Sequence, residues 1–136
     1  MLMPKKSKYR KHQKQKGSRK GTQSNTLELR FGRYGVKSTH HGEIHTRTVE
    51  AVRRAITRKL KRSGQVWTRV FPDRVVTTKP AEVRMGKGKG SPSHWVCRVR
   101  PGQVLYEIDG VTTPLAVQAV RLAHHKLPVN TSFVRL

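Results

Sequence analysis

The stretch TRTVEAVRRAITRKLKR, residues 46–62, is the clearest structural signal in the sequence. It contains neither glycine nor proline, which predicts a helix with Thr46 as its N-cap and Gly64 as its stop. At about 100° per residue, a single stripe of the helix is apolar. The members of this stripe are Val49, Val52, Ile56 and Leu60, and they predict a helix face packed on a domain core.

The opposite face of the same helix is cationic. Glu50 is the only acid within the helix, so pairing at i,i+4 neutralises little of the charge. A solvated face is the ordinary interpretation of charged helix residues, but the scarcity of acids favours an external anion. We call this surface the helix ridge; it is expected to bind nucleic acid through Arg47, Arg54, Arg58 and Lys61.

The whole chain shares this imbalance of charge. Its 136 residues contain 30 Lys+Arg against 7 Asp+Glu, a formal net charge of +23. Self-repulsion opposes folding at such a charge unless a polyanion neutralises it. Nucleic acid is the commonest such partner, because neutralised phosphates release counterions. Acidic proteins and an anionic membrane surface are the less favoured alternatives, and we expect no membrane partner. No apolar run approaches the ~20 residues of a membrane span.

Residues 1–26 have a composition of their own. They contain nine basic residues, no acid and almost no apolar side chain. Such a segment cannot bury a core, so we expect a basic arm that orders on its partner, rather than a tail that only aids solubility. The cations expected to bind are Lys5, Lys6, Lys8, Arg10, Lys11, Lys14, Lys16, Arg19 and Lys20.

Residues 27–136 are expected to form a single α+β domain. Alternation and turn signals predict strands over 27–31, 65–71, 75–78, 94–100, 103–108 and 129–135, with a hairpin at Pro101-Gly102. A second helix is expected from Pro114 to about Lys126, with Thr113 as N-cap and a face shared by Leu115, Ala119 and Leu122. This mixed order predicts a two-layer sandwich of mixed or antiparallel strands with two helices.

A glycine-lysine loop, residues 84–90, is a second candidate binding surface. It lacks the Ser or Thr that a Walker A loop needs after Gly-Lys, and it fails the dinucleotide pattern at positions 91 and 93. Glycines that expose backbone N–H groups beside cations suit an irregular phosphate backbone, although a flexible surface loop is the alternative. Its members are Arg84, Met85, Gly86, Lys87, Gly88, Lys89 and Gly90.

The sequence contains no residue pattern that indicates a catalytic site or a metal site. The histidines at 40, 41, 45, 124 and 125 lack the carboxylate or thiolate pattern of a metal site, and Cys97 is the only cysteine. Glu107 and Asp109 read as strand and turn residues, so we expect no catalytic residue, no metal and no cofactor. The aromatic residues are expected in the core rather than as stacking platforms, with Tyr34 the exception to watch; they are Phe31, Tyr34, Trp67, Phe71, Trp95 and Tyr106.

Several motifs appear in order along nearly the whole chain: KYRK at 8–11, FGRYG at 31–35, VFPD at 70–73, RMGKGKG at 84–90 and LYEIDGV at 105–111. The sequence closely resembles the bacterial-type large-subunit ribosomal protein sixteen family, which bacteria and organelles share. It departs from the family at Arg74 and Val75, where most members have Lys-Pro, and this leaves the exact turn open. Residues 30–38 and the ending FVRL are most similar to mitochondrial members.

The resemblance implies a non-enzymatic component of the large ribosomal subunit that binds rRNA near the central protuberance and the aminoacyl-tRNA (A) site. It implies an arm threaded into RNA, a glycine-lysine loop directed toward the tRNA path, and neighbouring ribosomal proteins as further partners. Arg33 is included among the expected rRNA-binding residues. The alternatives are another basic nucleic-acid-binding protein, either a DNA-compacting protein or an RNA chaperone, and an enzyme acting on RNA. Against the DNA-binding alternative, the sequence shows no recognition helix with base-reading Asn or Gln among its arginines.

Overall fold

The computed structural model describes residues 2–13 and 27–136. Within these residues the order of elements is β1 (Tyr34–Ser38), β2 (Gly42–His45), α1 (Thr46–Lys59), β3 (Gln65–Thr68), β4 (Arg74–Thr78), β5 (Ser91–Val99), β6 (Val104–Asp109), α2 (Thr113–His124) and β7 (Thr131–Arg135). The strands form a four-stranded sheet, β3-β6-β1-β7, and a three-stranded sheet, β2-β5-β4. Every pairing is antiparallel. The predicted α+β class with two helices is confirmed.

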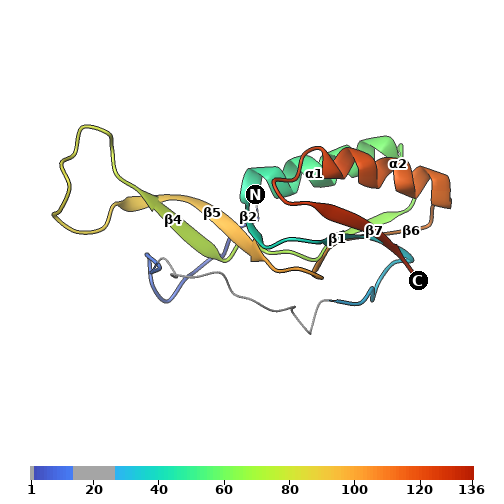
Figure 1. The fold of residues 1–136 in the computed structure, drawn as a ribbon, viewed down its shortest axis with the longest axis horizontal. Helices are drawn as coiled ribbons and strands as arrows, with labels where there is room; N and C mark the ends of the chain where they lie inside the picture. The colour runs from blue at the N-terminus through green and yellow to red at the C-terminus, as the bar shows by residue number, and fades with distance from the viewer. Residues whose placement is uncertain (1, 14–26) are drawn as a thin grey trace.

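The two helices lie side by side on one face of the four-stranded sheet (Figure 1). The predicted apolar stripe of α1 supplies much of the core, since Val49, Val52, Ile56 and Leu60 are at most 1% exposed. Tyr106 of β6 reaches this layer and donates its hydroxyl to the carbonyl of Val49 at 2.9 Å. A fully buried phenol with a hydrogen-bond partner fixes the distance between sheet and helix.

The ends of both helices differ from the prediction. His45 is the N-cap of α1, where its Nδ1 accepts the backbone N–H of Arg47 at 3.0 Å. Burial, with His94 and Arg47 nearby, lowers the pKa of His45, so the ring stays neutral and can accept. Thr46 instead lies buried in the first turn and donates to the carbonyl of Trp95 at 3.0 Å. The helix ends at Lys59, before the expected Arg62, because the chain reaches the left-handed region at Lys61, ahead of Gly64 (φ +70°).

Helix α2 begins one residue before the expected start, with Thr112 in place of Thr113 as N-cap. Its buried face is made of small residues, so the prediction of Leu122 on that face is wrong: Leu122 is 43% exposed. Small side chains let α2 approach α1 closely. The buried residues of α2 are Ala116, Ala119, Val120 and Ala123.

The predicted hairpin at Pro101-Gly102 does not form. Strand β5 pairs with β2 and β4, whereas β6 pairs with β1 and β3. The turn carries the chain from one sheet to the other because β1 binds it: Gly102 N–H donates to Ser38 O at 2.7 Å, and Ser38 N–H donates to Gln103 O at 2.8 Å. The strand expected over 65–71 also ends early, at Thr68, because the chain then crosses from the four-stranded sheet to β4 of the three-stranded sheet.

The strand expected over residues 27–31 is also absent. This segment crosses the face of the four-stranded sheet opposite to the helices (light blue in Figure 1). One carboxylate oxygen of Glu107 accepts the N–H groups of Arg30, Phe31 and Gly32 at 3.0, 2.7 and 2.9 Å. A side chain therefore satisfies the donors that a sheet ladder would have used.

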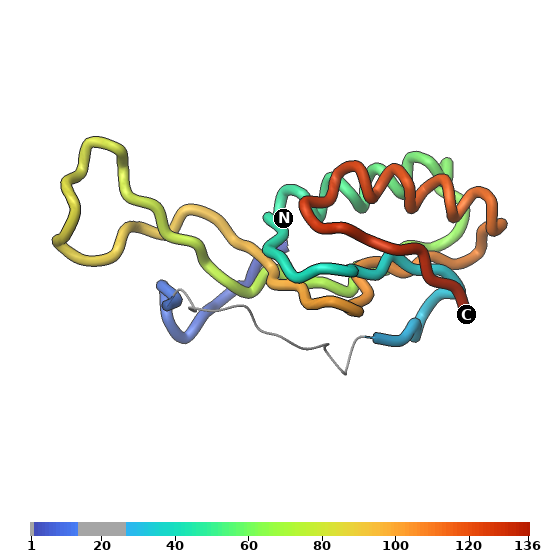
Figure 2. The backbone as a smooth tube through the Cα atoms, viewed as in Figure 1, coloured from blue at the N-terminus to red at the C-terminus, as the bar shows by residue number. Residues whose placement is uncertain are grey.

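The three-stranded sheet extends away from the helices, and the connection between β4 and β5 projects farthest (Figure 2). The N-terminal segment lies beside this sheet: Leu2 packs against the core, and Lys11 Nζ donates to Lys89 O at 2.8 Å. Among the described residues, no helix is long and apolar enough to cross a membrane.

Candidate nucleic-acid interface

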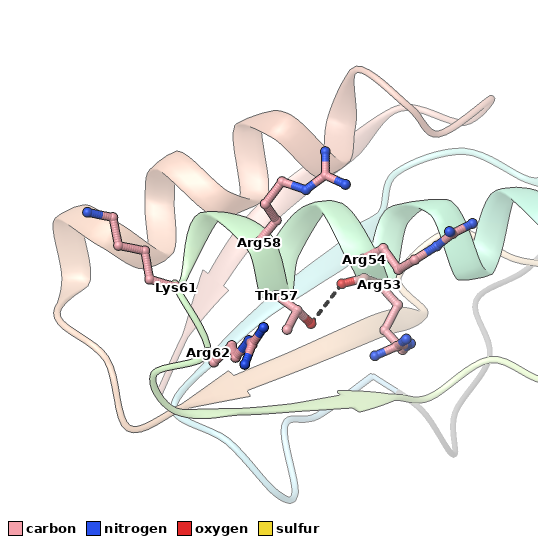
Figure 3. Close-up of a pocket in the computed structure, with 6 residues that line it drawn as sticks. All are labelled: Arg53, Arg54, Thr57, Arg58, Lys61 and Arg62. Carbon is pink, nitrogen blue, oxygen red and sulfur yellow. Dashed lines mark hydrogen bonds between the residues drawn. The ribbon is translucent and has the colours of Figure 1, made fainter.

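The helix ridge is exposed as predicted. The four residues that form it, Arg47, Arg54, Arg58 and Lys61, are all exposed. Toward the C-terminal end of α1 they are joined by Arg53 and Arg62, which were not predicted. Six residues line an open groove of about 380 Å³, and their cationic groups spread along the helix (Figure 3): Arg53, Arg54, Thr57, Arg58, Lys61 and Arg62.

Glu50 neutralises part of this groove. Its carboxylate accepts two hydrogen bonds from Arg53, at 2.7 and 2.9 Å, and lies 3.9 Å from Nε of Arg54. The hydrogen bond from Arg53 lowers the pKa of Glu50 and keeps it ionised near neutral pH. Since one acid faces five cations here, the groove keeps a positive charge held on a rigid helix.

The glycine-lysine loop is the most exposed part of the described chain. Residues 81–89 are all exposed, and Met85 reaches 99%. Gly86, Lys87 and Gly88 have φ values of +94°, +53° and +84°, so three successive residues adopt the left-handed region. A Cβ added at either glycine would meet no atom within 4 Å. The glycines are therefore needed for backbone conformation and not for packing.

The N-terminal segment and the loop are tied together at the base of the loop. Lys89 donates its ammonium group to the carbonyl of His12, and Lys11 donates to the carbonyl of Lys89. Lys79 also donates to the carbonyl of Gly86 at 2.5 Å. Lys89 thus has a structural contact, whereas Arg84 and Lys87 lie exposed farther along the loop.

Of the predicted arm residues, Lys5, Lys6, Lys8, Arg10 and Lys11 are exposed. The predictions for Lys14, Lys16, Arg19 and Lys20 fall outside the described residues. Arg33 lies elsewhere, in a pocket that it lines together with Asp109 and Leu115: its side chain is 79% exposed, and its Nε is 3.9 Å from Asp109 Oδ1. The predicted cations therefore occupy several separate surfaces.

The role of Glu107 was not predicted from the sequence. This residue is 0% exposed, and besides its three backbone donors it forms an ion pair with Arg69. Burial alone would raise its pKa, but the N–H groups of Gly32, Phe31 and Arg30, together with Arg69, outweigh it and lower the pKa. An acid in the middle of the apolar strand β6, in a chain with 7 acids, was the signal that could have revealed it.

The aromatic predictions hold in part. Tyr106 is fully buried, but Phe31 is 56% and Phe71 49% exposed, so the expectation of core positions is wrong for both. Tyr34 is half-buried; it stacks on Phe133 at 5.8 Å and shares a hydrogen bond with Thr113 at 2.8 Å. These contacts assign Tyr34 to packing between β1, β7 and α2.

Reactive groups do not assemble in the described part of the chain. His45 stacks on His94 with ring centroids 4.6 Å apart, but no group of three His, Cys, Asp or Glu residues within residues 2–13 and 27–136 could hold a metal ion. Burial raises the pKa of Cys97 to about 11, so its thiol is protonated at neutral pH.

Fold and surfaces together define a small, strongly basic α+β protein that displays cations on a rigid helix and on a projecting loop. The family model for ribosomal protein L16p/L10e matches residues 4–134, and the chain belongs to this family. It is 57% identical over 134 residues to large ribosomal subunit protein uL16m of Prototheca wickerhamii, with 98% of each chain covered. It is 53% identical over 135 residues to uL16 of Agrobacterium fabrum (strain C58 / ATCC 33970), covering 99% of this chain and 97% of that protein.

Membership of this family makes the chain a structural constituent of the large ribosomal subunit. It is not an enzyme, as the sequence patterns indicate.

Proposed function

We propose that the chain binds large-subunit rRNA near the central protuberance and helps to shape the A site for aminoacyl-tRNA. The observation that carries this proposal is the display of cations on two surfaces of different kinds. The helix ridge holds its charges at fixed positions, and the glycine-lysine loop offers backbone and lysines at a projecting tip. An irregular, folded RNA presents phosphates at both kinds of position.

The helix ridge is suited to the rRNA scaffold. Arginine side chains on a helix keep their spacing, so they match phosphates that are themselves held in a folded RNA. We assign rRNA binding to Arg47, Arg54, Arg58 and Lys61, and add Arg53 and Arg62 of the same groove. Arg33 and the N-terminal cations complete the rRNA-binding set.

The glycine-lysine loop is suited to a partner that binds transiently. It projects from the three-stranded sheet (Figure 2). Arg84, Met85 and Lys87 within it are exposed. Open space around Gly86 and Gly88 permits close approach of a sugar-phosphate backbone. We assign this loop to the tRNA path, with Lys89 fixing its base through the N-terminal segment.

Binding of the full-length chain to large-subunit rRNA, measured over a range of salt, tests this proposal. The slope of log K against log salt is negative, and its magnitude decreases by about 0.9 for each phosphate that the protein no longer neutralises. Changing Arg54, Arg58 and Lys61 to glutamine should reduce the slope by about two to three. Competition by duplex DNA separates the alternative function: equal competition by DNA and rRNA would reject a ribosomal role for the ridge.

The tRNA assignment has its own test. Large subunits reconstituted with Arg84→Ala and Lys87→Ala should assemble normally and bind aminoacyl-tRNA in the A site more weakly. An assembly defect with normal tRNA binding would assign the loop to rRNA alone.

We propose the mitochondrial matrix as the compartment. The identity to the mitochondrial relative is 57% and that to the bacterial relative 53%, and residues 30–38 and the ending FVRL are similar to mitochondrial members. Co-sedimentation with mitochondrial large subunits after cell fractionation would support this assignment, and sedimentation with cytoplasmic ribosomes alone would reject it.

A further inference from the structure

Phe31 is an exposed aromatic ring on a surface that neither the helix ridge nor the loop includes. Its side chain is 56% exposed. The ring stacks on Trp67 with centroids 6.0 Å apart and planes inclined by 20°, and the guanidinium carbon of Arg69 lies 5.2 Å from its centroid. The ring is therefore supported by neighbours while much of it faces solvent.

The backbone that carries this ring is firmly held. Phe31 N–H donates to Glu107 at 2.7 Å, and the N–H groups on either side donate to the same carboxylate oxygen. Gly32 lies so close to β6 that an added Cβ would be 2.5 Å from the carbonyl oxygen of Ile108. Glu107 is fully buried and paired with Arg69. A ring fixed in this way loses little conformational entropy when a ligand stacks on it.

The charges around Phe31 indicate what that ligand is. Arg30 and Arg33 flank the ring in sequence, and both are exposed. The acids near this segment are Glu28, Glu107, which is buried and paired with Arg69, and Asp109, which is 3.9 Å from Arg33. An apolar ring between arginines matches a nucleotide, because the base offers a π-face and the phosphates a negative charge.

We propose that Phe31 is a stacking platform for one unpaired base of RNA, with Arg30 and Arg33 placed for the adjoining phosphates. This inference rests on the RNA binding proposed above and adds a third contact surface to it. The segment that carries Phe31 lies on the sheet face opposite to the helices (Figure 1), so this contact surface is separate from the helix ridge.

Substitutions of the ring distinguish stacking from simple apolar contact. Binding of the full-length chain to large-subunit rRNA should weaken about tenfold in both Phe31→Ala and Phe31→Leu, and stay near wild type in Phe31→Trp. The salt slope should not change, because no charge is removed. Phe71→Leu is the matched control, since Phe71 is 49% exposed, and it should bind like wild type.

Three results would overturn the inference. The first is wild-type affinity of both Phe31→Ala and Phe31→Leu. The second is tolerance of leucine with weaker binding in alanine, which would indicate simple apolar contact with the RNA rather than stacking. The third is equally weakened binding in Phe71→Leu, which would show a general effect of exposed apolar surface.

A measurement on the wild-type sequence avoids any effect of substitution on folding. The chain has three phenylalanines, so fluorine labels on their rings give few resonances to assign. A short unstructured RNA should shift the Phe31 resonance, whereas polyphosphate, a polyanion without bases, should not. RNA binding with an unshifted Phe31, or an equal shift with polyphosphate, would contradict this inference alone. Failure of the chain to bind any RNA would contradict the proposed function itself.

Discussion

Two irregular segments of this protein contain glycines, and they use them in opposite ways. In residues 27–33 the backbone lies against the sheet: a Cβ at Gly32 would be 2.5 Å from Ile108 O, and one at Gly35, in the adjoining strand β1, would be 2.5 Å from Leu29 Cδ2 of this segment. In residues 84–90 Gly86 and Gly88 have open space around them and positive φ values. Gly32 is needed for close packing, whereas Gly86 and Gly88 are needed for backbone conformation. Gly90, at the base of the loop, is closely packed like Gly32, since an added Cβ would be 2.4 Å from Thr78 O.

This contrast shows how one small basic chain offers RNA both fixed and adaptable contacts. The first segment is held by a buried carboxylate, and the second is held at its base by lysines that donate to carbonyl oxygens. Changes in the first should therefore alter stability, and changes in the second should alter binding. Each of the following predictions tests this separation.

Glu107→Ala should produce the largest effect. It removes the acceptor of three N–H groups and leaves Arg69 without its ion-pair partner in a site where Glu107 is 0% exposed. Breaking such a pair costs about 3–5 kcal/mol, measurable as the free energy of unfolding in urea. Glu43→Ala is the control, because the pair of Glu43 with Arg98 is partly exposed and should be worth less than about 1 kcal/mol. Equal losses of unfolding free energy in the two variants would show that the buried carboxylate of Glu107 stabilises the fold no more than the partly exposed one of Glu43.

Gly32→Ala and Gly86→Ala form the next comparison. The first substitution forces a methyl group against the backbone of β6 and should destabilise by about 1–3 kcal/mol. The second meets no atom but disfavours a φ of +94°, which should cost no more than about 1 kcal/mol of unfolding free energy in an exposed loop. Its main effect should be weaker RNA binding. The comparison fails if Gly86→Ala lowers the unfolding free energy as much as Gly32→Ala and leaves RNA binding unchanged.

The pH dependence of the unfolding free energy should reveal the stabilising contribution of the ionised Glu107 carboxylate. Its pKa is below the ordinary value of 4.5 in the folded protein, so the carboxylate stabilises the fold fully above that value, and this contribution is lost as pH falls through the folded pKa. The difference in unfolding free energy between wild type and Glu107→Gln should therefore narrow below pH 4.5. A constant difference between about pH 7 and about pH 3 would show that ionisation of Glu107 does not contribute.

Lys87→Ala should have the smallest effect on the fold. Lys87 is exposed at the loop tip, so stability should stay within about 0.5 kcal/mol of wild type. If it contacts one phosphate, the salt slope of RNA binding falls by about 0.9. A lower stability with an unchanged slope would give the loop a structural role.

Local sequence patterns correctly predicted the features that depend on residues close together in the chain. The stripe of α1 follows from helical periodicity and is buried as expected, and the glycine-lysine loop is as exposed as its composition indicates. The alternation at 27–31 and the Pro-Gly turn at 101–102 were misleading, because Glu107 and Ser38 took the hydrogen bonds that a strand or hairpin would have made.

The parts of the site that were missed depend on residues far apart in sequence. Glu107 is 75–77 residues from its three backbone donors, so no local pattern joins them. Phe31 read as a core residue because its neighbours alternate, yet its ring lies outside the sheet on Trp67. Histidine is an uncommon N-cap; His45 accepts the N–H of Arg47 through Nδ1, and its lowered pKa favours the neutral ring that this bond needs.

The most direct test of the central claim is a map of the large ribosomal subunit that contains this chain. We predict that rRNA phosphates lie within about 4 Å of the cationic groups of Arg54 and Arg58 on the helix ridge, the separation of a direct ion pair. The glycine-lysine loop should point toward the tRNA path. A map in which the helix ridge faces solvent or another protein would contradict the account.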